Sequence, residues 1–267
     1  MTQTASLYFA LVRAGLRSQL QYRANFVIWI VMGVVFQATG FVFLWVVLSR
    51  FPSLAGWSLG EIAFLYGLRM LAHGLNILAF GYLHRIEWLV QRGELDRFLV
   101  RPVPALLHVI VDRFPVGAIG DFGGGVVLFL AANALVGVAW TAPALLYLVL
   151  AIVGGALIEA AVKLVIGTLC FRFLSTRALV FFADDVFNNF GNYPLPIFGP
   201  AVQLLLTFVL PVAFIAYFPA SVLLGRTAEL SVSPVLAYAA PLGGVVAFGL
   251  AYLFWRHELP RYQSTGS

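Results

Sequence analysis

Five ionisable side chains lie inside long apolar runs of this sequence, where a charge is costly unless it is paired or faces water. Arg69 and His73 are four residues apart on one helical face, and Glu159 and Lys163 have the spacing of a local ion pair. Asp121 lies near the middle of another apolar run. We expect Asp121 or Glu159 to neutralise Arg69, and some of these groups to line a path for a solute. Structural pairing between helices explains the same pattern equally well.

Two other patterns suggest enzymatic chemistry that the neighbouring residues do not support. Ser58 stands in a G-x-S-x-G pattern, which in serine hydrolases needs a strand and a sheet to present the nucleophile. Because Glu61 follows three residues later, we instead expect a capping box at a helix start. The single lysine, Lys163, lacks the Gly-rich sequence of a P-loop, so a P-loop ATP site is excluded. Four scattered histidines and one cysteine predict no metal site.

The composition requires these residues to be positioned by membrane-spanning helices. Of 267 residues, 62% are hydrophobic and 10% are charged, which excludes a soluble globular protein. A span takes about 20 apolar residues, so the chain is long enough for about six. We predict an all-α polytopic membrane protein with six transmembrane helices. Its apolar runs cover residues 24–49, 61–83, 105–138, 143–172, 201–225 and 233–255.

The position of the fifth crossing stays open at this point. Either residues 201–218 cross the membrane and residues 178–192 form an interfacial helix, or residues 178–195 form a short polar span. In the second case residues 197–225 fold back as a re-entrant hairpin at the outer face. Five prolines between positions 194 and 219 favour the second arrangement, because they interrupt helical backbone at membrane depth.

The distribution of arginine predicts that both termini face the cytoplasm, where Lys and Arg concentrate. Under the six-span arrangement, eleven arginines fall on one side: Arg13, Arg17, Arg23, Arg85, Arg92, Arg97, Arg101, Arg172, Arg177, Arg256 and Arg261. Only Arg50 and Arg226 fall on the other side. Residues 1–23 carry apolar side chains every four residues beside a stripe of arginines, which predicts a helix in the membrane interface. A helical extension of the first span is the alternative.

The charged segment 84–104, between the second and third runs, predicts two short helices separated at Gly93. Ile86, Leu89 and Val90 share one face of the first helix, and the charged residues point elsewhere. A short amphipathic element between two spans is suited to docking in a groove of a soluble partner. A solvated connector is the alternative.

Small residues recur every seven positions along the second run, at Gly60, Gly67, Gly74 and Gly81. Gly33 and Gly40 repeat this spacing in the first run. Such a seam lets another helix backbone approach closely. The sequence leaves open whether that helix belongs to the same chain or to a second copy.

Several fragments, taken in their order, resemble the permease subunits of bacterial type-2 ATP-binding-cassette (ABC) exporters. They are the amphipathic start of the chain, GELDR at 93–97 with Leu99 and Arg101-Pro102, NYPLP at 192–196, LTFVLP at 206–211, YFPA at 217–220 and RYQS at 261–264. The resemblance covers nearly the whole chain. It implies a single permease domain, residues 1–267, in the bacterial plasma (inner) membrane.

The resemblance also implies partners and roles. Two permease chains, identical or related, would face each other in the lipid above two ATPase subunits, which alone would bind ATP and Mg²⁺. Segment 84–104 would hold the coupling helix, and the expected contacts with the ATPase are Glu87, Arg92, Glu94, Asp96 and Arg97. The family's outer hairpin would correspond to residues 197–225.

That hairpin would place Asp184, Asp185, Asn188 and Asn189 in the fifth span, which is unusually polar for a drug pathway. Two alternatives from other classes remain. One is a secondary transporter or channel that uses Arg69, Asp121, Glu159 and Lys163 as an ion relay. The other is an intramembrane hydrolase built on Ser58. The substrate is not predicted, and no nucleic-acid partner is expected.

Overall fold

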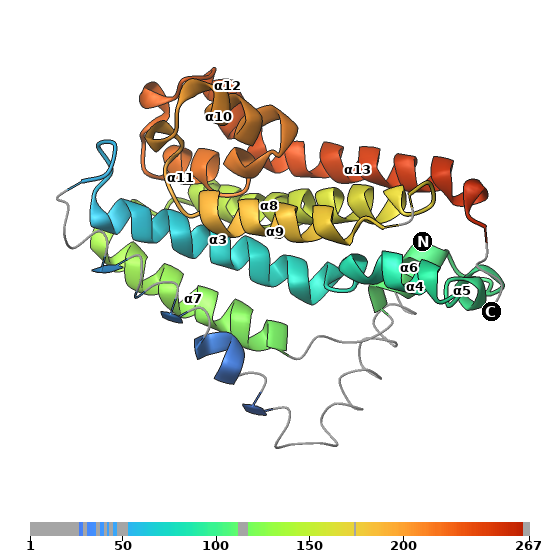
Figure 1. The fold of residues 1–267 in the computed structure, drawn as a ribbon. Coiled ribbons are helices and arrows are strands. Elements are labelled where there is room, and N and C mark those ends of the chain that lie inside the picture. Colours follow the sequence, from blue (N-terminus) through green and yellow to red (C-terminus); the bar gives the residue numbers. More distant parts are fainter. Residues whose placement is uncertain are drawn as a thin grey trace.

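A computed structural model describes residues 27–28, 31–35, 38–39, 42, 45–46, 53–111, 117–173 and 175–263. Within these residues the chain forms a bundle of long helices that run side by side (Figure 1). They are α3 (Leu59–Phe80), α7 (Gly117–Val136), α8 (Ala142–Leu169), α9 (Arg177–Phe190) and α13 (Ala240–Glu258). The predicted interfacial helix, residues 1–23, and most of the first apolar run lie outside the described residues.

Short helices gather at the two opposite ends of this bundle (Figure 1). One end, which we name the α4 end, holds η1 (Leu83–Arg85), α4 (Ile86–Gln91), α5 (Asp96–Leu99) and α6 (Ala105–Val111). The α11 end holds η2 (Leu195–Ile197), α10 (Pro200–Leu204), η3 (Leu205–Val209), η4 (Val212–Phe214), α11 (Tyr217–Leu223), η5 (Thr227–Glu229) and α12 (Pro234–Tyr238). A last short helix, η6 (Leu259–Arg261), follows α13.

Three described helices, α3, α7 and α8, are long and apolar enough to cross a membrane. A fourth candidate is the pair Pro200–Val209 and Val212–Leu223, which is bent by 72° at Pro211 and is either a broken span or a re-entrant loop. The 14-residue α9 and the 19-residue α13 are not among these candidates. The protein is therefore an all-α membrane protein, and the number of six spans stays a prediction.

The boundaries of two elements follow directly from local sequence. The capping box predicted at the start of α3 is confirmed: the Ser58 N–H donates to Glu61 Oε2 at 2.7 Å, and the Glu61 N–H donates to Ser58 Oγ at 3.4 Å. The predicted break at Gly93 is also present, between α4 and α5. Gly93 has a φ of +66°, a conformation that residues with a Cβ rarely adopt.

The glycine seam of α3 faces α7 of the same chain. A Cβ atom on Gly67 would lie 2.8 Å from the Cα of Phe129, and one on Gly74 would lie 2.7 Å from the Cα of Phe122. The two helices are antiparallel and keep this seven-residue register, since Gly60 meets Val136 as well as Leu135. At the end of the series, Gly81 caps the C-terminus of α3. Gly40, from the first run, lies outside the described residues.

The apolar interior is divided into two clusters along the bundle. The cluster toward the α11 end includes Trp57, Phe64, Phe129, Ile158, Phe187 and Phe218. The cluster toward the α4 end includes Leu83, Ile86, Leu95, Phe98, Leu164 and Trp255. Along α8 the two clusters meet at Glu159, which lies between Ile158 of the first and Ala160 of the second. The ionisable side chains are found where these clusters meet.

The seam makes a stability prediction. Gly67→Ala should lower the free energy of unfolding by about 1–3 kcal/mol, because the added methyl group overlaps the backbone of α7. Titration with sodium dodecyl sulfate, followed by circular dichroism, measures this change. Gly123→Ala is the matched control on α7, since nothing lies within 4 Å of its Cβ position. The control should raise stability by up to about 1 kcal/mol. Equal effects of the two substitutions would contradict the packing described.

Candidate functional site: a buried polar layer and the helices at the α4 end

Polar side chains of α3 and α8 inside the bundle meet polar side chains of the α9 region, where Asn188 is exposed and Asp184 is half-buried. We name this group the polar layer, and it consists of Arg69, His73, Asn76, Glu159, Lys163, Asp184, Asn188 and Asn192. On α3 and α8 its members repeat at intervals of three or four residues, and Asp184, Asn188 and Asn192 do the same along the α9 region. Each element therefore contributes one polar face.

Arg69 is 2% exposed and its contacts are made with neutral amides. Its Nη2 donates to Asn188 Oδ1 at 2.7 Å and its Nη1 donates to Asn192 Oδ1 at 3.3 Å. Asn192 in turn donates its side-chain N–H to the backbone carbonyl of Asn188. The expected direct pairing of Arg69 with Asp121 or Glu159 is therefore not present, because α9 rather than α7 packs over its guanidinium.

The acidic and basic groups of α8 also bond across helices and not along their own. Glu159, 0% exposed, has its Oε2 2.8 Å from His73 Nδ1. Lys163 Nζ lies 3.2 Å from Asp184 Oδ1 and 3.5 Å from Asn76 Oδ1. The local Glu159–Lys163 pair that the spacing suggested is replaced by these contacts.

The formal charges of the polar layer cancel when His73 is neutral. Two cations, Arg69 and Lys163, then balance two anions, Glu159 and Asp184. Within the described part of the chain, two buried polar atoms of the layer have no hydrogen-bond partner, namely Arg69 Nε and Glu159 Oε1. A layer that combines cancelled charge with spare hydrogen-bonding capacity is able to stabilise the bundle and still accept a polar ligand.

Two predicted members of the polar path lie outside this layer. Asp121 is on α7 and faces the first apolar run, where a Cβ atom on Gly33 would lie 3.1 Å from Asp121 Oδ1. Asp185 is exposed on α9. Asn76 lies near Arg69 and His73 on the predicted second span, and Asn188 belongs to the polar fifth span, so both were accessible from the sequence. Asn192 was not expected to bind Arg69, and its four-residue spacing from Asp184 and Asn188 was the available signal.

Glu87, predicted as a contact for an external partner, is instead bonded within the chain. The residue is 8% exposed, and its carboxylate accepts hydrogen bonds from the Thr176 N–H at 3.0 Å, Thr176 Oγ1 at 3.1 Å and Ser175 Oγ at 2.8 Å. Gln91 Nε2 donates a fourth at 3.0 Å. Because Thr176 is the N-cap of α9, Glu87 ties α4 to the start of that helix.

The other predicted contact residues lie toward the surface of the α4 end. Arg92 is exposed and its guanidinium stacks on Trp88 at 4.3 Å. Glu94 and Arg97 form an ion pair at 3.4 Å, and Asp96 is half-buried. Next to them Val100 is 84% exposed, which is unusual for an apolar side chain that ends a helix. The surface thus combines charges of both signs with an apolar tip.

A buried carboxylate also holds the ends of α8 and α13 together at the α4 end. Glu258, 1% exposed, receives two hydrogen bonds of 2.6 Å from Arg172 and one of 2.8 Å from Arg261. Charge-assisted bonds of this kind are short and geometrically specific. The short helices of the α4 end thus pack on α8, α9 and α13, whose ends are fixed relative to one another.

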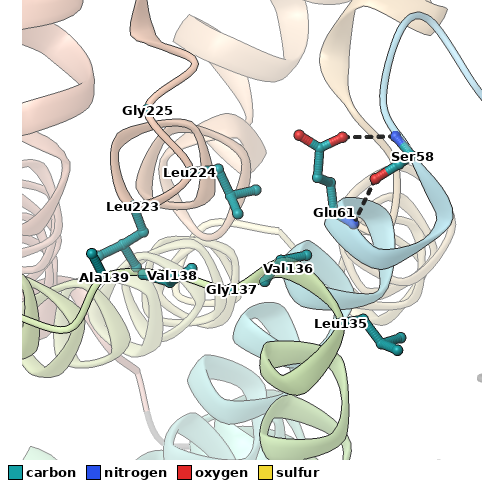
Figure 2. Close-up of a pocket in the computed structure, with 10 residues that line it drawn as sticks. All are labelled: Ser58, Glu61, Leu135, Val136, Gly137, Val138, Ala139, Leu223, Leu224 and Gly225. Carbon is teal, nitrogen blue, oxygen red and sulfur yellow. Dashed lines mark hydrogen bonds between the residues drawn. The ribbon is translucent and has the colours of Figure 1, made fainter.

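The α11 end contains a cavity of about 520 Å³. Figure 2 shows the residues that line it: Ser58, Glu61, Leu135, Val136, Gly137, Val138, Ala139, Leu223, Leu224 and Gly225. Glu61 accepts hydrogen bonds from Arg226 at 2.8 and 2.9 Å, and Arg226 also binds Glu229. Among the described residues, no histidine lines this cavity, and Ser58 serves as a helix cap, so the arrangement does not support a serine hydrolase.

The polar layer predicts that removing a buried carboxylate lowers stability much more than removing an exposed one. Glu159→Gln should lower the free energy of unfolding by about 3 kcal/mol, because it leaves Arg69 and Lys163 with only one acidic counter-charge. The matched control is Asp185→Asn, which removes an exposed carboxylate from the neighbouring helix and should change stability by less than about 0.5 kcal/mol. Unfolding in sodium dodecyl sulfate measures both, and a larger effect at Asp185 would contradict the described layer.

Comparison with known proteins assigns this architecture to a family. A family model described as "ABC-2 family transporter protein" matches residues 34–266, which is most of the chain. Neither the curated proteins nor the solved structures contain a match.

Proposed function

The chain belongs to the ABC-2 family of transporter proteins, and we propose that it forms the translocation path of an exporter driven by a separate ATPase subunit. It is a multi-pass membrane component of an ABC transporter. ATP and Mg²⁺ bind to the partner ATPase, and this chain supplies no covalent chemistry. The observation that carries the proposal is the way the α4 end is joined to the long helices of the bundle.

The α4 end is built to transmit a displacement. Glu87 connects α4 to the first turn of α9 through Ser175 and Thr176. The apolar side chains of α4 and α5 share one core with residues of α8 and α13, including Leu164 and Trp255. A push on this segment therefore moves three long helices together, because a close-packed core deforms little. This is the mechanical requirement of a coupling helix.

The surface of the same segment has the features of a docking site. Arg92, Glu94, Asp96 and Arg97 offer charges of both signs, and Val100 projects an apolar side chain beside them. Short helices of this kind bind in a groove, where the apolar tip supplies affinity and the charges select the partner. We assign docking on the ATPase to this surface, and we assign transmission to the buried Glu87.

The polar face of α9 supplies the proposed path. Asp185, Asn188 and Asn189 are exposed on α9, and Asn188 together with the half-buried Asp184 also binds side chains of α3 and α8. In a dimer of permease chains this face lines a polar route between the two copies. Residues 197–225, bent at Pro211, form the outer hairpin that closes the route. With six spans, both termini and the α4 end lie in the cytoplasm of a bacterial inner membrane.

Charge reversal tests the docking surface. The natural chain, purified in detergent, should carry an ABC-type ATPase with it, and the Arg92→Glu and Glu94→Lys double variant should weaken this association by about 100-fold or more, because like charges then face each other. Association is measured by co-purification and by titration of the separated ATPase. The matched control is Arg256→Glu, which reverses an exposed charge on α13 near the same end.

The control should keep its ATPase. If the natural chain purifies without an ATPase and its vesicles move a solute on an ion gradient alone, the polar layer is the driving device and the exporter proposal fails.

A substitution of Glu87 distinguishes the transmission of movement to the long helices from docking on the ATPase. Glu87→Gln should keep the ATPase bound, since the side chain is buried, but it places an amide N–H against the donors of Ser175 and Thr176. We expect the stimulation of ATPase activity by the permease to fall about tenfold. The comparison is ATPase turnover in reconstituted vesicles against affinity in the titration above. Loss of binding with unchanged turnover per complex would place Glu87 on the docking surface instead.

A further inference from the structure

A second cleft, of about 310 Å³, lies between α4 and the first half of α9. We name it the α4–α9 cleft. It is formed by side chains that neither the docking surface nor the translocation path uses: His84, Arg85, Trp88, Arg177 and Phe181. Two acidic residues also line the cleft: Glu87, which connects α4 to α9, and Asp184 of the polar layer. The cleft therefore lies beside the contact through which α4 would move α9.

Two arginines of this cleft have aromatic rather than acidic neighbours. The Arg85 guanidinium lies 4.3 Å from the Trp88 ring centroid, and that of Arg177 lies 5.5 Å from the Phe181 centroid. Within the described ranges, neither guanidinium has a carboxylate within ion-pair distance, in contrast to Arg172 and Arg226. A guanidinium stacked on a ring keeps its N–H groups available for an anion.

The acidic groups of the cleft are already engaged. The Glu87 carboxylate accepts from Ser175 and Thr176, and Asp184 pairs with Lys163 at 3.2 Å. Burial lowers the pKa of His84, although its hydrogen bond with the Gly81 backbone acts in the opposite direction. His84 is therefore uncharged at neutral pH, and the cations that a ligand meets are Arg85 and Arg177.

An apolar patch adjoins the cleft in the first turns of α9. Phe181, which lines the cleft, is 59% exposed, and Leu179 and Phe182 are also exposed, whereas the exposed residues farther along α9 are polar, namely Asp185, Asn188 and Asn189. In a membrane protein such a patch can contact an acyl chain, and the arginines lie at the level where α9 begins. The ligand that matches both parts is an amphiphile with an anionic head.

We propose that the α4–α9 cleft binds an anionic phospholipid of the cytoplasmic leaflet, whose phosphate is held by Arg85 and Arg177 while its acyl chain lies against Phe181 and the other exposed apolar side chains in the first turns of α9. Arginine is suited to this role because its fork of N–H groups matches phosphate oxygens. A lipid in this position contacts both α4 and α9. It would therefore reduce the movement of α4 relative to α9, as the hydrogen bonds of Glu87 also do. The proposal rests on the orientation given under Proposed function but not on ATP coupling.

The test titrates the purified full-length chain, in detergent and without an ATPase, with dioleoyl phosphatidylglycerol or dioleoyl phosphatidylcholine. Native mass spectrometry gives the dissociation constant of each lipid. The natural chain should prefer phosphatidylglycerol, and Arg85→Gln with Arg177→Gln should weaken its binding by about 30-fold, the loss expected for two cations near an anionic surface. Phosphatidylcholine has the same phosphate but no net charge, so its weaker binding should fall by a much smaller factor.

The matched control pair is Arg101→Gln with Arg256→Gln, which removes the same charge from exposed positions outside the cleft. It should change the affinity for phosphatidylglycerol by less than twofold. An equal loss in the control, or equal affinity of the natural chain for both lipids, overturns the site. If the glutamine pair does not fold, two other results test the site. The natural chain should prefer phosphatidylglycerol, and the Arg85→Lys with Arg177→Lys pair should retain this preference.

A soluble phosphate ester is the other source of the same chemistry. Glycerol 3-phosphate is added as a competitor at millimolar concentration. Failure to displace phosphatidylglycerol supports the lipid, whereas displacement at a concentration similar to that of the lipid overturns the assignment to the membrane. Because no ATPase is present, a negative result here leaves the exporter proposal intact, and loss of ATPase association leaves this one intact.

Discussion

The structure depends on one constraint: charged groups inside an apolar bundle must find partners there. Arg69, Glu159, Lys163 and Asp184 come from three helices, and each bonds to a residue of another helix. Contacts of this kind set the axial positions of α3, α8 and α9, because sliding one helix by a turn would separate every partner at once. The polar layer occupies the place where the two apolar clusters meet, so the same contacts also define how the clusters are joined.

Close backbone packing holds the remaining pairs of long helices together. Glycines of α3 bring it against α7, and Gly154 of α8 lies so close to Pro241 and Gly244 of α13 that no side chain could be added there. Without a strong hydrophobic driving force between helices in lipid, such small-residue contacts and interhelical hydrogen bonds hold the helices together. At the α4 end Glu87 and Glu258 extend this rigidity to the short helices through charge-assisted bonds. The α11 end, with its bend at Pro211, has more broken helical backbone.

Features that arise from neighbouring residues were predictable. The capping box at Ser58, the break at Gly93 and the limits of α3 and α8 follow from spacing and periodicity over a few turns. Membership of the ABC-2 family was likewise predictable from fragments in a fixed order, and it is the basis of the functional proposal. The role of Glu87 was not, because its position on a charged segment suggested exposure, whereas its partners Ser175 and Thr176 lie almost ninety residues away.

The sequence by itself determined that this is a helical membrane protein, where several of its helices run, and which of its buried groups need partners. Composition and short-range periodicity are enough for these conclusions, since a span and its caps form from adjacent residues. Only the tertiary structure decided who the partners are: Asn188 and Asn192 for Arg69, His73 for Glu159, Asp184 for Lys163, and α7 for the glycine seam. The physical reason is that hydrogen bonds reach about 3 Å, so their choice depends on how distant helices are brought together.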